Sequence, residues 1–338
     1  MAVTIKDVAR EANVSVATVS RALNGHDNVA EPVRRRVMQV ANALRYSPHH
    51  AARSLSSRRT HTIGVVLPDL YGEFFSELMR GIDQVARERS LHLLVSSYHG
   101  NPEEQGAALL AMRGRVDGLL VMSPFVAEGG GPAAGDAPAL PTVLMNSAQA
   151  GPGAAAVSID NHGGARRMTS HLLACGYRRI AFIAGPTRNF DARERLRGYC
   201  EVLEEAGLAP RVVPGTFDEA SGHDAGAALL ASGDLPDAVF AANDMMALGC
   251  LYAFTQDGLQ VPRDVALAGF DDIPLARYVH PALTTMQVDI AELGGRALRA
   301  LLAQGDHAAT DAEAGLLSPR LIVRDSTGPA HIAARHRS

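Results

Sequence analysis

The stretch from residue 4 to residue 24 carries the hydrophobic pattern of two short helices joined by a tight turn. Thr4 followed by Asp7 is a capping-box pattern, and it predicts a helix that begins at Ile5. Ser15 is a good N-cap and predicts the start of the second helix. Apolar residues at helical spacing predict the inward faces, which are Ile5, Val8, Ala9 and Ala12 in the first helix and Val16, Val19, Ala22 and Leu23 in the second.

A third helix and a linker follow. Pro32 is predicted to open a helix that runs to about Leu44 and closes a three-helix core over the first pair. The Tyr-Ser-Pro run at 46–48 ends it, because the residue before a proline is pushed out of the helical region. Residues 49–57 are poor in large apolar groups and too few to hold a helix alone. They form either a flexible linker or a short helix that folds only on a surface.

From Ile63 onward, apolar strands alternate with amphipathic helices. This alternation predicts parallel sheets with helices on both faces. Two successive doubly wound units are visible, with the break near Asp160. The run from Ala127 to Pro141 interrupts the alternation, since it is rich in Gly, Pro and Ala where a helix is expected. A last helix is predicted at 290–302 and a strand-like tail at 320–323, and both are expected to pack on the two units that precede them in the sequence.

Composition places the chain among globular proteins with large cores. Its 338 residues and 47% hydrophobic content allow two or three domains. No apolar run reaches transmembrane length, and the N-terminus lacks the apolar region of a signal peptide, so we expect a cytoplasmic protein with no membrane partner. The cysteines are isolated and the histidines scattered. We therefore expect no disulfide framework, no metal site and no other cofactor.

Charge is distributed unevenly between the N-terminal part and the rest. Residues 1–60 hold ten basic and four acidic side chains, a net charge of +6, so the remainder must carry −10 to give the total of −4. A basic head on an acidic body favours binding to a phosphate backbone through counterion release. A solvated charged face explains a milder asymmetry equally well.

The predicted helix-turn-helix suggests a way of reading DNA. In such a unit the second helix lies in the major groove, while the first crosses the phosphate backbone. Val16 and Ala17 would then sense groove shape and thymine methyl groups, and Arg21 could pair with a guanine. An ordinary helical hairpin without DNA is the alternative, because short motifs match by chance.

Short motifs spread along nearly the whole chain share one resemblance. They are Thr-Ile-Lys-Asp-Val-Ala at 4–9, Val-Ser-Val-Ala-Thr-Val-Ser-Arg at 14–21, Tyr-Ser-Pro at 46–48, Ala-Ala-Arg-Ser-Leu at 51–55, Asn-Asp at 243–244, Gly-Phe-Asp-Asp at 269–272 and Pro-Ala-Leu-Thr-Thr at 281–285. Together they resemble the lactose/galactose repressor (LacI/GalR) family of bacterial transcription regulators.

The resemblance implies a repressor that binds a near-palindromic double-stranded operator as a homodimer. It also implies that Leu55 enters a central base step, often CG, where an apolar wedge can kink the duplex. The DNA contacts that we predict are Thr4, Ser15, Val16, Ala17, Thr18, Ser20, Arg21, Asn24, Tyr46, Ala52, Arg53 and Leu55.

The predicted fold is an N-terminal all-α helix-turn-helix head followed by an α/β body. The resemblance implies that this body is two-lobed and periplasmic-binding-protein-like, with two doubly wound parallel sheets and three strands joining the lobes. The expected divisions are a head at 1–46, a hinge helix or linker at 47–61, a first lobe at about 62–160 and 290–318, a second lobe at about 161–289 and 319–328, and a disordered tail at 329–338. The glycine-rich run at 127–141 departs from the family, which usually has a helix there.

A small effector is expected between the lobes, because ligands of doubly wound sheets bind beyond the carboxyl ends of the strands. The polar residues at those ends are Asp69, Asn146, Asp160, Asn243 and Asp271. Family effector positions carry over onto Arg195, Asn243 and Asp271, whose guanidinium, amide and carboxylate suit the vicinal hydroxyls of a sugar or glycoside. Phe74 and Phe75 follow the first strand, where an aromatic face could stack on the ligand.

Each of these residues also has a structural interpretation. The alternative to ligand contact is a place in the core for Phe74 or Phe75, a helix cap for Asp160 or Asp272, and a structural salt bridge for Arg195 with Asp271.

An enzyme on the same kind of sheets is the competing class of function. A nucleotide-dependent dehydrogenase would need G-x-G-x-x-G after the first strand, where Pro-Asp-Leu-Tyr-Gly stands at 68–72, and a sugar kinase would need a phosphate-binding motif. No P-loop lysine motif and no G-x-S-x-G nucleophile elbow occurs. We predict no catalytic residue, and we keep a nucleoside or purine as the alternative effector.

Overall fold

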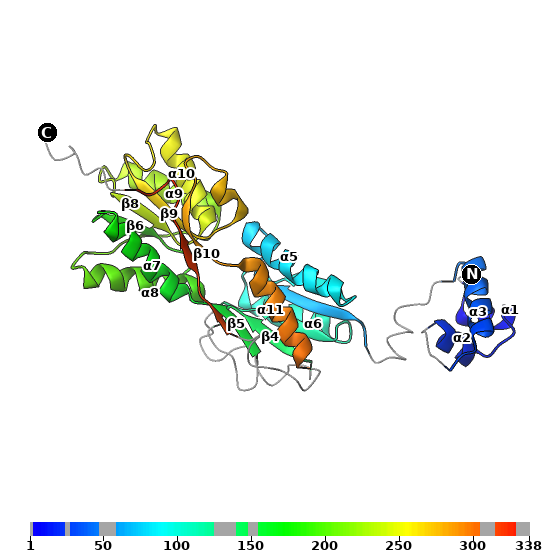
Figure 1. The fold of residues 1–338 in the computed structure, drawn as a ribbon. Coiled ribbons are helices and arrows are strands. Elements are labelled where there is room, and N and C mark those ends of the chain that lie inside the picture. The colour runs from blue at the N-terminus through cyan, green and yellow to red at the C-terminus, as the bar shows by residue number, and fades with distance from the viewer. Residues whose placement is uncertain are drawn as a thin grey trace, which may run out of the picture. The chain divides into compact units, whose positions relative to one another are not determined.

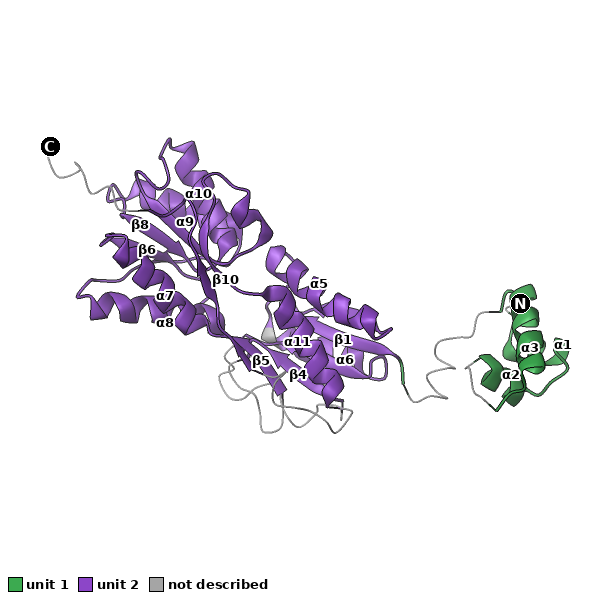
Figure 2. Ribbon diagram, viewed as in Figure 1, with its two compact units in different colours: residues 1–60 green, residues 61–338 purple. Residues whose placement is uncertain are grey.

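The computed structural model describes residues 3–23, 28–46, 59–124, 140–147, 155–304 and 315–328. The chain divides into two compact units, residues 1–60 and residues 61–338 (Figure 2). The predicted linker at 49–57, the glycine-rich run through residue 139 and the predicted tail at 329–338 lie outside the described residues.

The first unit is a three-helix head made of α1 (Ile5–Glu11), α2 (Val16–Leu23) and α3 (Glu31–Ala43). The capping box of α1 is formed as predicted, because Thr4 and Asp7 each accept from the other's backbone amide. Val8, Val19 and Val37 have no exposed surface and hold the three helices together. The structure corrects one prediction, since Val16 is 41% exposed and does not belong to the inward face of α2.

The first sheet of the second unit has the order β11-β5-β4-β3-β1-β2, and all its strands run parallel. Its strands are β1 (Thr62–Leu67), β2 (His92–Ser97), β3 (Gly118–Met122), β4 (Thr142–Met145), β5 (Ala155–Ile159) and β11 (Gly315–Leu317). Alternate residues of β1 point to opposite faces: Val65 packs with α5 (Glu73–Glu88) and α11 (Ile290–Ala303), and Val66 packs with α6 (Pro102–Met112).

The second sheet has the order β12-β10-β9-β8-β6-β7. Its strands are β6 (Ile180–Ile183), β7 (Arg211–Val213), β8 (Ala238–Ala241), β9 (Ala266–Asp271), β10 (Thr284–Gln287) and β12 (Arg320–Ile322). The edge strand β12 is antiparallel to β10, while the other pairs are parallel. The helices are α7 (Asn161–Ala174), α8 (Phe190–Glu205), α9 (Glu219–Ala231) and α10 (Asp244–Gln256), and α7 packs on α8 as α9 packs on α10 (Figure 1).

The chain passes between the two sheets three times. These passages lead from β5 to α7, from β10 to α11 and from β11 to β12. Strands β10 and β11, of four and three residues, were not among the predicted elements.

Two helix pairs approach so closely that glycine is required at the contact. A Cβ atom built on Gly81 of α5 would lie 1.8 Å from the carbonyl oxygen of Ala291 on α11. One built on Gly249 of α10 would lie 1.9 Å from the carbonyl oxygen of Glu219 on α9.

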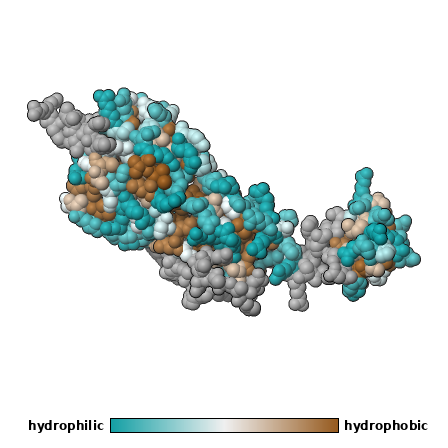
Figure 3. Space-filling view, in the orientation of Figure 1, coloured by the Kyte–Doolittle hydropathy of each residue, from teal (hydrophilic) through white to brown (hydrophobic). Residues whose placement is uncertain are grey.

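The visible face of the molecule is mostly hydrophilic, with hydrophobic side chains gathered in patches (Figure 3). None of the described helices is long and apolar enough to span a membrane.

Candidate DNA-binding head and effector cleft

Helix α2 presents an exposed face to solvent. Val16, Ala17 and Arg21 are exposed on it, and Ser20 is half-buried beside them. Val16 and Ser20 are four residues apart, as are Ala17 and Arg21, and Ala17 and Ser20 are three apart, so the four positions lie on one side of the helix. The face offers apolar contacts and one guanidinium, which are groups suited to base edges in a major groove.

Other predicted DNA contacts have a structural task as well. The Oγ atom of Ser15 accepts from the backbone amide of Thr18 at 3.1 Å and caps α2. The hydroxyl of Thr4 donates to Asp7 at 2.7 Å at the start of α1. Tyr46 is half-buried against the head core. The four remaining predicted contacts, Asn24, Ala52, Arg53 and Leu55, lie outside the described residues.

A cleft of about 680 Å³, part of it open to solvent, lies between the carboxyl ends of the two sheets. Six of the predicted effector residues line it: Phe74, Phe75, Asn146, Arg195, Asn243 and Asp271. The chain segments that follow β1, β3 and β4 form one wall, and those that follow β7, β8 and β9, with α8, form the other.

Arg195 on α8 is the central charge of the cleft. Its Nη2 lies 3.1 Å from Oδ1 of Asp271. Its Nε donates to Oδ1 of Asn161 at 2.8 Å, and its Nη1 donates to the carbonyl oxygen of Ala242 at 2.6 Å. The guanidinium also lies 3.8 Å above the ring of Phe270. The structural salt bridge therefore exists, in a position that also lines the cleft.

Asp271 lies at the end of β9 with φ of +114°, a conformation that costs free energy for a residue with a side chain. Burial raises the pKa of this carboxyl to about 6, against the opposing effect of Arg195. Such strain and such a shift are typical of functional positions.

Asp191 is a cleft residue that the sequence analysis missed. It lies in the first turn of α8, one helical turn before Arg195, and accepts from Nδ2 of Asn161 at 2.8 Å. Burial raises the pKa of Asp191 to about 7, against the effect of Arg195 and of hydrogen bonds from Asn146 and Asn161. The signal was present, since an acid four residues before a predicted site arginine shares its helix face.

Asn243 and the two phenylalanines combine structural contacts with a place in the cleft wall. Oδ1 of Asn243 accepts from the amide of Met246 and caps α10, and its Nδ2 donates to the carbonyl oxygen of Phe217 at 2.8 Å. Phe74 and Phe75 meet edge to face, with ring centroids 5.5 Å apart, and both pack against the core. The core interpretation of Phe74 and Phe75 therefore holds in the structure, and all three residues also line the cleft, while their contact with an effector stays a prediction.

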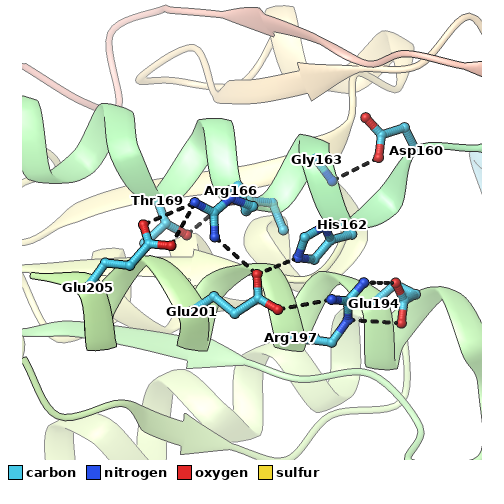
Figure 4. A network of polar contacts seen from close by, with 10 residues as sticks. Asp160, His162, Gly163, Arg166, Thr169, Glu194, Arg197, Glu201 and Glu205 are labelled. Carbon is cyan, nitrogen blue, oxygen red and sulfur yellow. Dashed lines mark hydrogen bonds and ion pairs between the residues drawn. The ribbon is translucent and has the colours of Figure 1, made fainter.

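Two predicted effector residues lie elsewhere. Asp160 caps α7 by accepting from the amide of Gly163 at 2.8 Å (Figure 4), and it lies 3.5 Å from Nη2 of Arg167. Asp69 is exposed, and its carboxylate accepts from the two following backbone amides. Neither is in the cleft lining. The structure contains the helix cap that was the alternative interpretation of Asp160, since a carboxylate just after a strand serves equally well to cap the next turn or helix. An effector contact of Asp69 or Asp160 stays a prediction.

An exposed ion-pair network fixes the outer face of α8 on α7 (Figure 4). Glu201 of α8 receives hydrogen bonds from Arg166 and Arg197, and its Oε2 lies 2.7 Å from Nε2 of His162. Arg166 also reaches Glu205 at 2.9 Å. Because this network and the buried Arg195 lie on opposite faces of one helix, the packing of α8 sets the position of the cleft cation.

Histidine, cysteine and carboxylate side chains form no cluster suited to a metal ion within the described residues.

Comparison with known proteins shows the family of a chain with this head and this cleft. Residues 4–49 match the model of bacterial regulatory proteins of the lacI family, and residues 169–327 match that of the periplasmic binding protein-like domain. The chain is 35% identical over 332 residues to catabolite control protein A of Priestia megaterium. The aligned region covers 97% of this chain and 100% of that protein.

The chain belongs to the LacI family. It is also 34% identical to the transcriptional regulator GalR of Escherichia coli, over 99% of this chain and 98% of that protein. Among solved structures, the lac repressor dimer bound to operator and the anti-inducer ONPF matches with a TM-score of 0.87 and 28% identity, over 97% of this chain and 100% of that one. The transcriptional regulator CelR in complex with cellobiose matches with a TM-score of 0.65 and 31% identity, over 96% of this chain and 99% of that one.

Membership in the LacI family confirms the predicted fold class, a helix-turn-helix head with a two-lobed periplasmic-binding-protein-like body. It also decides between the competing functions. LacI-family proteins are transcription regulators that bind operator DNA and small effectors. The chain is accordingly a regulator of this family and not a dehydrogenase or sugar kinase.

Proposed function

We propose that this LacI-family regulator represses transcription by binding a near-palindromic operator as a homodimer, with α2 of each head in the major groove. The exposed face of α2, with Val16, Ala17 and Arg21, supports this placement. The lac repressor, which matches over nearly the whole chain, is a dimer bound to operator. The net charge of +6 on residues 1–60 adds an attraction to phosphates that salt weakens.

We further propose that residues 47–61 form the hinge between the head and an effector-binding body at 62–328. In this proposal Leu55 wedges a central base step when two copies meet on DNA. Replacing Leu55 with alanine should weaken operator binding and reduce the bend without unfolding the body. Unchanged affinity in a gel-shift titration would exclude the wedge.

The proposed effector is a sugar or glycoside bound in the cleft. The observation that carries this is the set of buried polar groups converging there. In the described part of the chain Oδ1 of Asn146 has no hydrogen-bond partner, and Oδ1 of Asp271 is engaged only by its ion pair with Arg195. Buried polar groups without a partner are rare, and a polyol would supply the missing donors. CelR with cellobiose shows a sugar complex in a similar chain.

A purine or nucleoside is the second candidate for the effector. The phenyl rings of Phe74, Phe75 and Phe217 in the cleft wall could stack on a base. The HTH-type transcriptional repressor PurR of Haemophilus influenzae is 33% identical over 96% of this chain. A sugar fits better, because the unmet groups of the cleft are acceptors and a polyol carries more donors than a purine.

Binding of the effector is coupled to binding of DNA only through a difference in affinity. The operator affinity changes by the ratio of the effector's affinities for the two arrangements of the lobes. An effector that prefers the arrangement with separated heads is an inducer, and one that prefers the other is a corepressor.

A thermal-shift screen tests this proposal. Mono- and disaccharides, glycosides, purine bases and nucleosides are added to the full chain, because a ligand that binds only the folded state raises the melting temperature. Each hit is then added to a gel-shift titration with operator selected from random DNA. Replacing Asp271 with asparagine should leave operator binding intact and abolish the response to the hit. A normal response in this variant would remove Asp271 from the effector site.

A further inference from the structure

The unmet hydrogen-bonding capacity of the cleft is acceptor capacity. Among the described residues that line it, Oδ1 of Asn146 is buried without a hydrogen-bond partner, and Oδ1 of Asp271 has only its ion pair with Arg195, which leaves one of its lone pairs able to accept. The amide of Asn146 hydrogen-bonds to Asp191. Since a carboxylate accepts, the nitrogen of that amide is its donor and the oxygen is left for the cleft. A ligand that satisfies these two atoms must bring donors.

The cation of the cleft is already engaged by the protein. Each nitrogen of the Arg195 guanidinium lies within 3.1 Å of an oxygen atom, on Asn161, Ala242 or Asp271. Arg195 is the one basic side chain in the described cleft lining. A phosphate or carboxylate group on a ligand would therefore meet a cation whose charge is shared with two acids.

Those acids leave the cleft negative when both are ionised. Asp191 and Asp271 are buried beside a single guanidinium, so one carboxylate charge is uncompensated. Asp191 is one helical turn from Arg195 on α8 and is joined to it through Asn161, which donates to the aspartate and accepts from the arginine. An anionic ligand would be repelled by this excess charge in a site of low dielectric constant.

We propose that the cleft selects an uncharged or amine-bearing polyol, whose hydrogens meet Asn146 and Asp271, and that Asp191 is the specificity-determining residue that excludes phosphorylated and acidic ligands. The inference rests on the proposed function, since it takes the effector to lie in this cleft. It goes further by adding Asp191 to the site and by fixing the charge class of the ligand.

The test compares matched sugars on the full-length chain at about pH 8, above the raised pKa values of Asp191 and Asp271, so that both carboxylates are mostly ionised. Glucose, galactose and mannose are each used in four forms, namely the neutral sugar, the 2-amino sugar, the 6-phosphate and the uronic acid, and dissociation constants are measured by calorimetry for every form that shifts the melting temperature. We expect binding by neutral or amino forms, with the corresponding phosphate and uronate at least tenfold weaker.

Two variants show whether Asp191 is responsible. Asp191→Asn keeps an oxygen that can accept from Asn161 but removes the negative charge. The gap in affinity, which is the ratio of the dissociation constants of the phosphate form and the neutral form, should therefore narrow about tenfold, as expected for loss of one close charge pair. Asp257→Asn removes an exposed charge at the end of α10 and should leave the gap unchanged.

The unfavourable outcomes separate the two proposals. A phosphate or uronate that binds the wild-type chain as tightly as its neutral parent overturns this inference and leaves a sugar effector standing. An unchanged gap in Asp191→Asn removes Asp191 as the determinant. Absence of binding by all twelve sugars, together with a purine or nucleoside that binds and changes operator affinity, overturns the sugar effector itself.

Discussion

Nη2 of Arg195 lies 3.1 Å from Oδ1 of Asp271, and the two side chains are only 4% and 5% exposed. The ion pair joins α8 to the end of β9 on one side of the cleft. Removing two charges from water costs several kcal/mol, so such a pair adds little net stability, yet loss of one partner leaves the other charge uncompensated. Its main effect is therefore to fix the position of a carboxylate that faces the cleft.

Replacing Arg195 with alanine should lower the free energy of unfolding by about 3–5 kcal/mol, because Asp271 and Asp191 would lose their shared cation. Arg197→Ala is the matched control on the same helix. Arg197 is 51% exposed in its pairs with Glu194 and Glu201, so its loss should cost about 1 kcal/mol or less. Urea denaturation measures the free energy of unfolding of each variant. Equal losses for the two variants would show that the buried pair has no special role.

The stability of the chain should depend on pH through the two cleft acids. The folded-state pKa values of Asp191 and Asp271 are raised from 3.8 to about 7 and about 6. The folded state thus binds more protons than the unfolded state, and the stability that these groups contribute is complete below pH 4 and is lost as the pH rises through 6 and 7. Asp191→Asn should therefore gain stability relative to the wild type between pH 5 and pH 8. Parallel curves of unfolding free energy against pH would contradict this.

The sequence predicted the positions that a regular pattern or a specific motif defines. The capping box of Thr4, the core valines of the head and the alternation of strands and helices each follow from local periodicity, and the structure contains them. Arg195 and Asp271 were placed in the cleft by family motifs, and they line it.

What sequence could not decide was which of two equally suitable tasks a polar residue performs. Asp69 and Asp160 follow the ends of β1 and β5, much as Asp271 ends β9, but their carboxylates accept hydrogen bonds from neighbouring backbone amides. Val16 fits the apolar spacing of α2, but of the predicted inward face Val19 and Ala22 are buried while Val16 is 41% exposed. Asp191 went unnoticed because its importance comes from the two asparagines that approach it from distant segments.

A hydrogen bond across the cleft should hold the two lobes together. The hydroxyl of Tyr71, after β1, donates to Oε1 of Glu219 at the start of α9, and the amide of Leu275 donates to Glu73 at 3.2 Å. Tyr71→Phe removes the first contact. Because one such bond contributes about 0.5–1.5 kcal/mol, hydrogen exchange at residues 72–76 should become about 3- to 10-fold faster. Tyr278→Phe, on an exposed tyrosine of the second lobe, should leave that exchange unchanged.

Alanine substitutions at Val16 and Val19 should affect operator recognition and the stability of the head differently. Val16 is 41% exposed and Val19 is fully buried, although both lie on α2. Val16→Ala should change the head's stability by no more than about 0.5 kcal/mol, and should weaken binding to a selected operator by about 1 kcal/mol through loss of an apolar contact with a base edge. Val19→Ala leaves a cavity in the head core and should lower its melting temperature together with its affinity for all DNA. The measurement is the ratio of operator affinity to affinity for a scrambled duplex at one salt concentration. An unchanged ratio in Val16→Ala would show that this side chain does not face the bases.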